Sequence, residues 1–336
     1  MPLAAFPLAA VLSWLFVPWV VRLATAIGFI DLPEARKLHT SATPLLGGVS
    51  VFVAALITWL VATRVLPRAP ADWEAYYLLT GAAVALGVGV WDDRFGMQPS
   101  VKMLGQAAAG TLLLAAGVTP ELGLPVGIEA VLALVALIAL MNAVNFLDNM
   151  NGMVGGIAAL TLAAFAWTSL ERGAHGTAAA QLALAGACFG FLPHNFPRAR
   201  IFLGDAGSLF LGYSLGASAL LALRATPPGW GQAGPLLMLA YPAFDMIFVI
   251  VTRMRDGRPV WLGGKDHSNH RLATLLRCPI RTVLLIWCST AVLSAAGIAI
   301  LQDPQPLKVL LLSGLSTMLL VWSGLRLSSV PLAPKA

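Results

Sequence analysis

Long runs of apolar residues, separated by short polar segments, dominate the chain. A membrane-spanning helix needs about 20 apolar residues to cross about 30 Å of hydrocarbon. Eleven stretches reach or approach this length, at about 3–27, 46–66, 76–91, 101–118, 127–147, 153–170, 177–193, 206–224, 233–252, 280–301 and 306–326. The longest polar interval, about 253–279, leaves no room for a separate soluble domain. We therefore predict one integral membrane domain over residues 1–336, an all-α polytopic bundle of about eleven transmembrane helices.

The composition supports a membrane protein. Of the 336 residues 58% are hydrophobic and 11% are charged, whereas soluble domains average about 25% charged residues. The same values exclude a disordered chain, which would be poor in apolar residues. Cys188, Cys278 and Cys288 have no ligand-like spacing, which excludes a disulfide scaffold. The net charge of +6 therefore indicates loop placement and anionic partners before nucleic acid.

The basic residues predict the orientation of the chain. Cytoplasmic loops carry an excess of Lys and Arg. Fifteen of the 21 Lys and Arg residues fall in one set of alternating loops, and Arg22 lies inside the first stretch; the other set has only Arg64, Arg68, Arg172, Arg224 and Lys308. We expect the N-terminus outside and the C-terminus in the cytoplasm. No basic segment precedes the first stretch, so a membrane helix is favoured there over a cleavable signal peptide.

Two adjacent carboxylates end the third apolar stretch. Asp92 and Asp93 lie where this predicted helix meets the cytoplasm, and Lys102 follows ten residues later. A solvated helix end is one interpretation. Acidic residues at a helix C-terminus oppose its dipole, however, so the pair favours a role with a cation or in proton transfer.

A polar run joins the fifth and sixth stretches. Asn142, Asn145, Asp148 and Asn151 recur every three residues, which would place them near one face of a continuing helix. Helix capping would explain one of them. Carbonyl and carboxylate oxygens on one face suit a hard cation such as Mg²⁺.

Asp205 precedes the eighth stretch, between Gly204 and Gly207. It could cap the helix, or it could hold a metal beside a helix N-terminus that faces an anion. Neither interpretation is specific without further information.

The last long loop contains the sequence GGKDHSNHRL. His267 and His270 could bind zinc, but no third or fourth ligand is evident, so phosphate recognition by Arg271 and protonated His is favoured. Asp245 lies about two turns inside the preceding stretch. An ionisable residue at that depth is either functional or buried in a hydrogen bond to a neighbouring helix.

Taken in order, these segments resemble one family. The motifs are DLPEARKLHTSATPLLGGVSVF, DDRFGMQPSVKMLGQ, NAVNFLDNMNG, FLGDAGSLFLG, PAFDMIFVIVTR and DHSNHRL, and they cover about 31–272. This run resembles the polyprenyl-phosphate N-acetylhexosamine-1-phosphate transferases, the glycosyltransferase 4 or MraY-like family. The sparse histidines of DHSNHRL look more like the WecA-like branch, which uses UDP-GlcNAc and undecaprenyl phosphate, than like the phospho-MurNAc-pentapeptide translocase.

The resemblance implies an enzyme that moves a sugar 1-phosphate, most simply GlcNAc-1-phosphate, from a UDP-sugar to polyprenyl phosphate and releases UMP. It implies Mg²⁺ dependence, with Mn²⁺ as an alternative. The implied catalytic residues are Asp92, Asp93 and Asp205, and the implied metal ligands are Asp205, Asn151 and Asp148. The implied substrate-binding residues are Lys37, His39, Lys102, Asn145, His267, His270 and Arg271. The family pattern has Asp where this chain has Asn151. That change keeps a carbonyl ligand but removes a charge, so Asp148 would contribute more. Asp92 is the better candidate proton acceptor.

The expected setting is the bacterial inner membrane, with the active site on the cytoplasmic face and a product that starts cell-envelope polysaccharide synthesis, such as lipopolysaccharide or O-antigen. The expected partners are the two substrates and membrane lipid, without nucleic acid, and a homodimer stays open. One alternative is the pentapeptide translocase. Another is a secondary transporter, although no internal repeat pairs the two halves. The third is an inactive scaffold, which intact Asp92, Asp93 and Asp205 disfavour.

Overall fold

The computed structural model describes residues 2–31, 42–65, 73–260, 264 and 266–330. Helices make up most of this part of the chain. They are η1 (Pro2–Ala4), α1 (Ala5–Ala26), α2 (Gly47–Val65), α3 (Trp73–Phe95), α4 (Pro99–Ala115), α5 (Val126–Leu147), α6 (Met153–Glu171), α7 (His175–Asn195), α8 (Gly204–Arg224), η2 (Trp230–Gln232), α9 (Ala233–Met238), α10 (Ala240–Arg255), α11 (Ser268–Leu276), α12 (Pro279–Gln302) and α13 (Pro306–Ser328). Two short antiparallel strands, β1 (Ile30–Asp31) and β2 (Thr43–Pro44), follow α1.

The predicted all-α membrane bundle is confirmed. Within the described residues, nine helices are long and apolar enough to cross a membrane, and the bent pair Trp230–Met238 and Ala240–Arg255, with an angle of 73°, makes a tenth if it is one span. The remaining predicted stretch, 101–118, forms α4, whose 17 residues rise about 25 Å, less than the hydrocarbon thickness. The total of eleven spans and the orientation of the termini stay predictions.

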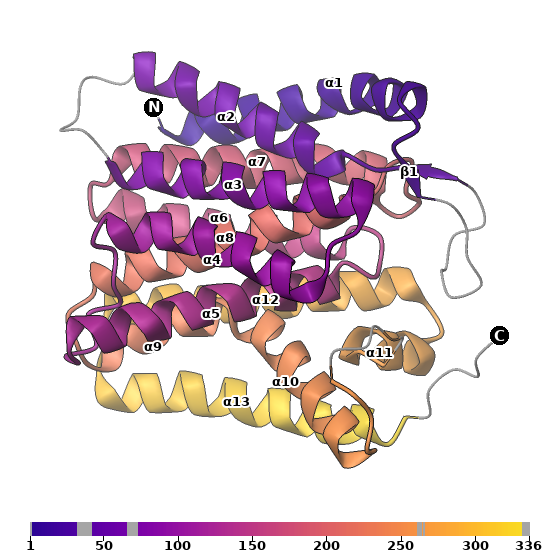
Figure 1. Cartoon of the computed structure of the whole chain (residues 1–336). Coiled ribbons are helices and arrows are strands. Elements are labelled where there is room, and N and C mark those ends of the chain that lie inside the picture. Colours follow the sequence, from indigo (N-terminus) through magenta and orange to yellow (C-terminus); the bar gives the residue numbers. More distant parts are fainter. Residues whose placement is uncertain (1, 32–41, 66–72, 261–263, 265, 331–336) are drawn as a thin grey trace.

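Helix α8 forms the centre of the bundle (Figure 1). Its apolar segment is completely buried, and the helix packs against α2, α3, α5 and α6. Small residues make this packing close, because they let helix backbones approach. A Cβ atom at Gly48 would overlap the backbone of Gly207, so the close approach of α2 to α8 depends on glycine at this position.

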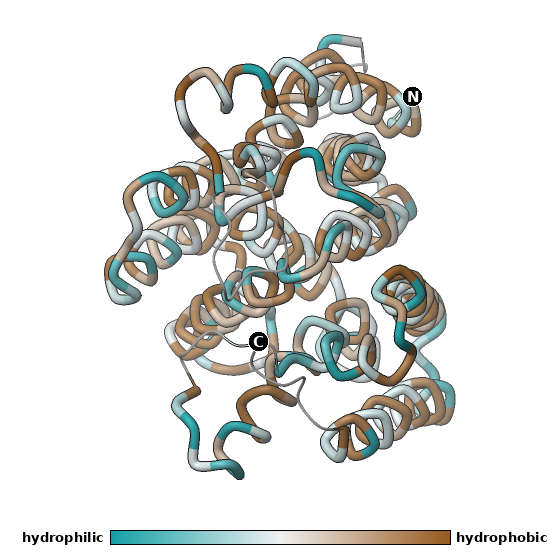
Figure 2. The backbone as a smooth tube through the Cα atoms, turned by 90° about the vertical axis from the view of Figure 1, so that its right-hand side faces the viewer, coloured by the Kyte–Doolittle hydropathy of each residue, from teal (hydrophilic) through white to brown (hydrophobic). Residues whose placement is uncertain are grey.

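The bundle has two ends. The end that carries β1, α11 and the end of α13, on the right of Figure 1, is called the site end here; the opposite end is called the distal end. Helix α1 begins at the distal end and α13 finishes at the site end. Figure 2 looks at the site end and shows hydrophilic residues in many of its connections. The alternating direction of the helices brings the ends of α3 and α5 and the beginnings of α4 and α8 to this end.

Candidate active site

At the site end, a lysine on one helix contacts two carboxylates that belong to two other helices. Lys102, on α4, lies with its Nζ 2.7 Å from Oδ2 of Asp92 and 2.6 Å from Oδ2 of Asp205. Asp92 belongs to the last turn of α3, and Asp205 to the first turn of α8. The lysine therefore offsets the repulsion between two acids that lie more than a hundred positions apart in the sequence.

The second oxygen of Asp205 is also held. Nδ2 of Asn145, on α5, donates to Oδ1 of Asp205 at 2.7 Å and to Oγ of Ser208 at 2.8 Å. Oδ1 of Asn145 accepts a hydrogen bond from Nζ of Lys102 at 3.2 Å. Contacts from α4 and α5 thus fix the Asp205 carboxylate in one orientation. Ser208 was not among the predicted residues, and one turn of helical spacing after Asp205 is the signal that could have indicated it.

Asp93 has a different position from its neighbour. Its two carboxylate oxygens accept the backbone N–H groups of Asp205 at 2.9 Å and of Ala206 at 3.0 Å, so that Asp93 caps the beginning of α8. Gly204 makes room for this contact: its φ is +74°, and a Cβ there would lie 2.6 Å from Oδ2 of Asp93. Asp93 therefore fixes the backbone that carries Asp205.

Asp148 follows the last residue of α5 and is half-buried. Burial raises the pKa of Asp148 to about 8, and the nearby Asp205 and Asp93 carboxylates add to this rise. Among the described residues, Lys102 is the one basic side chain bonded to this group of four acids, formed by Asp92, Asp93, Asp148 and Asp205. Within the described residues, the acidic groups of the site therefore outnumber the basic side chains bonded to them.

The oxygen donors of the site suit a hard cation. No group of three or more His, Cys, Asp or Glu side chains in the described part of the chain has the geometry of a metal site.

The predicted residue Asn151 lies in the loop after α5. It donates from Nδ2 to the carbonyl of Pro197 at 3.2 Å, which ties this loop to the loop after α7. Lys37 and His39 lie outside the described residues.

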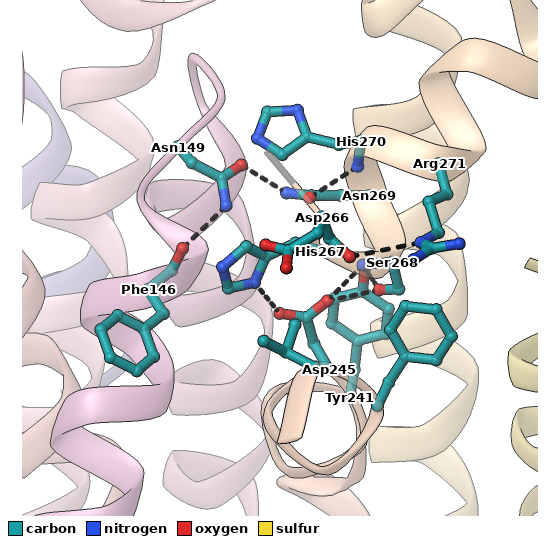
Figure 3. Close-up of polar contacts among 12 residues, drawn as sticks. Phe146, Asn149, Tyr241, Asp245, Asp266, His267, Ser268, Asn269, His270 and Arg271 are labelled. Carbon is teal, nitrogen blue, oxygen red and sulfur yellow. Dashed lines mark hydrogen bonds and ion pairs between the residues drawn. The ribbon is translucent and has the colours of Figure 1, made fainter. Parts of the chain in front are cut away.

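Asp245 and His267 form the centre of a second polar cluster (Figure 3). Nδ1 of His267 lies 2.7 Å from Oδ2 of Asp245. Ser268 donates to Oδ1 of Asp245 twice, from its backbone N–H at 2.8 Å and from its hydroxyl at 2.6 Å. Asp245 is fully buried and His267 is 4% exposed. Asp245 thus makes buried hydrogen bonds, as one of the two interpretations expected, with His267 before α11 and with Ser268 at the beginning of α11.

Two arginines of α10 and its following loop hold the adjacent Asp266. Arg253 donates from Nε and Nη2 to both carboxylate oxygens, at 2.9 and 2.7 Å, and Arg258 lies 2.9 Å from Oδ2. Burial raises the pKa of Asp266, but these ion pairs outweigh burial and keep the pKa below its usual value. Neither arginine was among the predicted site residues, because no local spacing connects them with Asp266.

Two predicted substrate-binding residues of α11 are also placed. Nη1 of Arg271 donates to the carbonyl oxygens of Leu327, Ser328 and Val330, at 3.3, 3.0 and 2.9 Å, so its guanidinium ties α11 to the end of α13. A substrate contact by Arg271 would require these bonds to be replaced. The His270 ring lies 6.4 Å from the His267 ring, centroid to centroid.

The two clusters meet at the end of α5. Asn145 contacts Asp205, while Phe146, the next residue, has its ring centroid 6.2 Å from that of His267. Nδ2 of Asn269 donates to Oδ1 of Asn149 at 2.7 Å. The structure thus brings together the predicted residues Asp92, Asp93, Lys102, Asn145 and Asp205, and it connects the His267 segment to them through residues 145–149.

Comparisons with known proteins give a consistent result. A sequence model of glycosyl transferase family 4 matches residues 75–223. A decaprenyl-phosphate N-acetylglucosaminephosphotransferase of Mycolicibacterium smegmatis is 31% identical, over 88% of this chain and 81% of that protein. An undecaprenyl-phosphate alpha-N-acetylglucosaminyl 1-phosphate transferase of Haemophilus influenzae is 30% identical, over 82% and 80%. A probable undecaprenyl-phosphate N-acetylglucosaminyl 1-phosphate transferase of Bacillus subtilis is 27% identical, over 88% and 84%.

Proposed function

Because the chain belongs to glycosyl transferase family 4, we propose that it transfers N-acetylglucosamine 1-phosphate from UDP-GlcNAc to a polyprenyl phosphate and releases UMP. The names of the relatives support this proposal, because they give transfer of an N-acetylglucosamine phosphate group with decaprenyl or undecaprenyl phosphate. The observation that carries the proposal is the cluster of Asp92, Lys102 and Asp205 at one end of an apolar bundle. A water-soluble nucleotide sugar and a lipid phosphate can both reach such a position.

The reaction joins two anions. An oxygen of the acceptor phosphate attacks the β-phosphorus of the donor; the bond from that phosphorus to the bridging oxygen breaks, and UMP leaves with the electron pair. A phosphate monoester with a second pKa of about 6 is mostly dianionic at pH 7, so the attacking oxygen needs little help from a base. Catalysis then depends mainly on position and on stabilisation of negative charge.

The contacts of the acids divide their roles. Asp92 uses Oδ1 to accept the N–H of Met97 at 2.7 Å and Oδ2 to contact Lys102. It is the candidate acceptor for any proton that the lipid phosphate still carries. Asp93 has both oxygens bonded to the backbone of α8, which supports a positioning role. Lys102 would move from the carboxylates toward a substrate phosphate, since an ammonium group suits either anion.

The donor set also supports a bound divalent cation. When bound, Mg²⁺ would stabilise the developing charge on the phosphates, and Mn²⁺ has similar ligand preferences. We propose Asp205, Asp148 and Asn151 as its oxygen ligands. Magnesium sites commonly use one or two carboxylates together with substrate phosphates and water, so a closed cage of protein ligands is not required. The excess of acids over Lys102 supports the same assignment.

The proposed setting is the inner membrane of a bacterium, with the site end in the cytoplasm. The distribution of Lys and Arg between alternating loops supports this orientation. UDP-sugars are made in the cytoplasm, and the phosphate of a membrane lipid lies at the same surface. The product, a polyprenyl-diphosphate-linked sugar, would start an envelope polysaccharide.

The test is UMP release by the purified full chain in detergent. Undecaprenyl phosphate is supplied with UDP-GlcNAc, UDP-GalNAc or UDP-MurNAc-pentapeptide, and each donor is tested with Mg²⁺ and with EDTA. We expect release from UDP-GlcNAc only with the metal. Release from the pentapeptide donor alone would instead identify a translocase. Uptake of substrate into proteoliposomes without UMP release would identify a transporter.

A further inference from the structure

We propose that Asp245 is a positioning residue, which fixes the ring orientation and the protonated nitrogen of His267 so that the imidazole presents Nε2 to a phosphate of the nucleotide-sugar donor. The proposal rests on the proposed function. It assigns Asp245 no contact with substrate. Its basis is the geometry of three residues from two segments, Asp245 on α10 and His267 with Ser268 at the beginning of α11.

The hydrogen bonds decide which ring nitrogen carries a proton. Asp245 accepts two donors from Ser268 at Oδ1, the backbone N–H and the hydroxyl, at 2.8 and 2.6 Å. Its Oδ2 lies 2.7 Å from Nδ1 of His267. An ionised carboxylate only accepts hydrogen bonds, so with Asp245 in this form Nδ1 supplies the hydrogen. The other nitrogen, Nε2, is then the atom that remains for a ligand.

Nε2 of His267 has no hydrogen-bond partner among the described residues. It is also not one of the fully buried side-chain atoms that lack a partner, so this nitrogen stays accessible to a ligand. In Figure 3 the His267 ring lies between Asp245 and the segment that carries Phe146 and Asn149. That segment also contains Asp148, one of the four acids of the site. A phosphate near these acids would therefore be on the side of the ring that faces away from Asp245.

The side chains on both sides of His267 have partners other than Asp245. Arg253 clamps Asp266 with two hydrogen bonds, and Asn269 is bonded to Asn149. The hydroxyl of Tyr241 lies 3.3 Å from Oγ of Ser268. The imidazole ring, in contrast, makes its one hydrogen bond within the described residues to Asp245, which also holds the backbone N–H of Ser268.

A purely structural role for Asp245 is the competing explanation, because the residue also caps the first turn of α11. The two roles differ in their dependence on His267. A positioning residue acts through the ring, so its removal costs nothing further once the ring is gone. A cap stabilises the helix whether or not the ring is present. A double-mutant cycle separates these cases.

The experiment compares the wild-type chain with D245N, H267A and the double variant D245N/H267A. The amide that D245N introduces can still accept the hydrogen bonds of Ser268, but it supplies no charge to Nδ1. Partners that orient a functional histidine typically contribute about 10- to 100-fold. We expect D245N and H267A each to raise KM for UDP-GlcNAc or lower kcat/KM by about that factor, with KM for undecaprenyl phosphate unchanged. In the H267A background, D245N should have an effect below about twofold, because two residues that act through one contact are not additive.

E129Q serves as the matched control. Glu129 is 4% exposed and accepts the backbone N–H of Leu124 at 3.0 Å, so it is a buried capping carboxylate at the distal end. Its variant should leave both KM values unchanged. D245N effects that persist at full size in the H267A background, or that raise both KM values together, would overturn the proposal in favour of capping alone.

Two further readouts keep the proposal separate from the proposed function. Thermal stability in detergent shows whether D245N is folded. If it is not, D245E takes its place in the cycle, because its longer side chain displaces the carboxylate from Nδ1. Binding of UMP to the full chain needs no turnover. If the wild-type protein released no UMP from UDP-GlcNAc, the proposed function would fail. Equal weakening of UMP binding by D245N and H267A would still support the positioning role. Unchanged UMP binding in both variants would reject the positioning role.

Discussion

The distal end and the site end of the bundle both hold ionisable side chains, yet they satisfy these groups in different ways. At the distal end, Glu129 accepts a backbone N–H. Glu171 accepts hydrogen bonds from Trp167 at 2.9 Å and Gln302 at 2.6 Å. Arg172 donates to the carbonyl of Ala222 and to the hydroxyl of Thr226, at 3.2 and 3.0 Å. Neutral groups or the backbone provide the hydrogen bonds of these three side chains, and the acids Glu121 and Asp303 each have a basic partner of their own, Arg224 at 3.8 Å and Lys308 at 3.4 Å.

At the site end, several acidic groups are brought together instead. Asp92 and Asp205 share one ammonium group, and the nearby Asp148 has a pKa raised to about 8. Such an arrangement costs folding energy unless a ligand offsets it, and titratable groups with perturbed pKa values gather at functional sites. The comparison teaches that segregation of charge, more than its amount, distinguishes a site from a scaffold in this bundle.

The largest expected effect follows from removing the charge at the centre of the site. Asp205→Asn keeps the size of the side chain, and the new amide can still contact Asn145, but it loses the ion pair with Lys102. Removal of one preorganised electrostatic contact commonly costs about 100- to 1,000-fold in kcat. We expect a loss of at least that order in UMP release. The measurement is initial-rate UMP release with saturating Mg²⁺.

Glu129→Gln makes the same chemical change at the distal end, where we expect UMP release within about twofold of wild type, as for a change far from the site. Equal thermal stability of the two variants would show that the difference lies in catalysis. Near-normal release by Asp205→Asn would contradict the assignment of the site.

Removal of the shared cation should have the next largest effect. Lys102→Met leaves Asp92 and Asp205 without their common partner and takes away a donor for a substrate phosphate. Hydrogen bonds to charged groups contribute about 1.5–3 kcal/mol each, which corresponds to about 10- to 100-fold in kcat/KM. We expect a loss in this range, smaller than that of Asp205→Asn because a divalent cation can offset part of the lost charge.

Kinetics at several Mg²⁺ concentrations check this prediction. The Lys102→Met defect should shrink as the Mg²⁺ concentration rises, since the metal and the ammonium group offset the same acids. A defect that is independent of Mg²⁺ would separate the lysine from the carboxylates functionally, against their contacts in the structure.

A pH-dependent stability effect should distinguish Asp148. The folded protein holds its proton up to a pKa of about 8, whereas the unfolded chain loses it near pH 4, at about the ordinary pKa of Asp. Because the folded state binds more protons between these values, the contribution of Asp148 to stability falls as the pH rises from about 4 to 8. Asp148→Asn removes this loss. In EDTA, the melting temperature of the variant minus that of wild type should therefore increase from about pH 5 to about pH 8; a constant difference would contradict the raised pKa.

The bundle itself could be predicted from the sequence because most of the apolar stretches are long enough to cross a membrane. Asp92, Asp93, Lys102, Asn145 and Asp205 were also predicted as site residues, since each lies where a predicted helix meets the same face. Their individual contacts were not predictable. Two adjacent acids look alike in the sequence, but Asp93 caps α8 while Asp92 binds Lys102, a difference that depends on how α3 and α8 pack.

Other features depend on tertiary contacts that no local pattern records. The continuous apolar run 233–252 does not predict the 73° bend between α9 and α10. Pro242 gives a physical reason for it, because proline has no N–H to continue the helical ladder from the preceding turn. Arg271 was predicted to contact phosphate, yet in the structure it binds carbonyls at the end of α13, which no spacing near α11 indicates.

The smallest effect on catalysis is expected at the distal end. A variant there gives the simplest test of the difference between the distal end and the site end. Glu129→Ala removes the acceptor for the N–H of Leu124 and leaves that group without its partner, which typically costs about 1–3 kcal/mol. An acidic residue in the first turn of α5 is also favoured by the helix dipole. The melting temperature should therefore fall, while both KM values and kcat of the folded fraction stay within about twofold of wild type. If Glu129→Ala instead raised KM for UDP-GlcNAc without lowering the melting temperature, the distal end would share in the site, and segregation of charge would no longer separate the two ends.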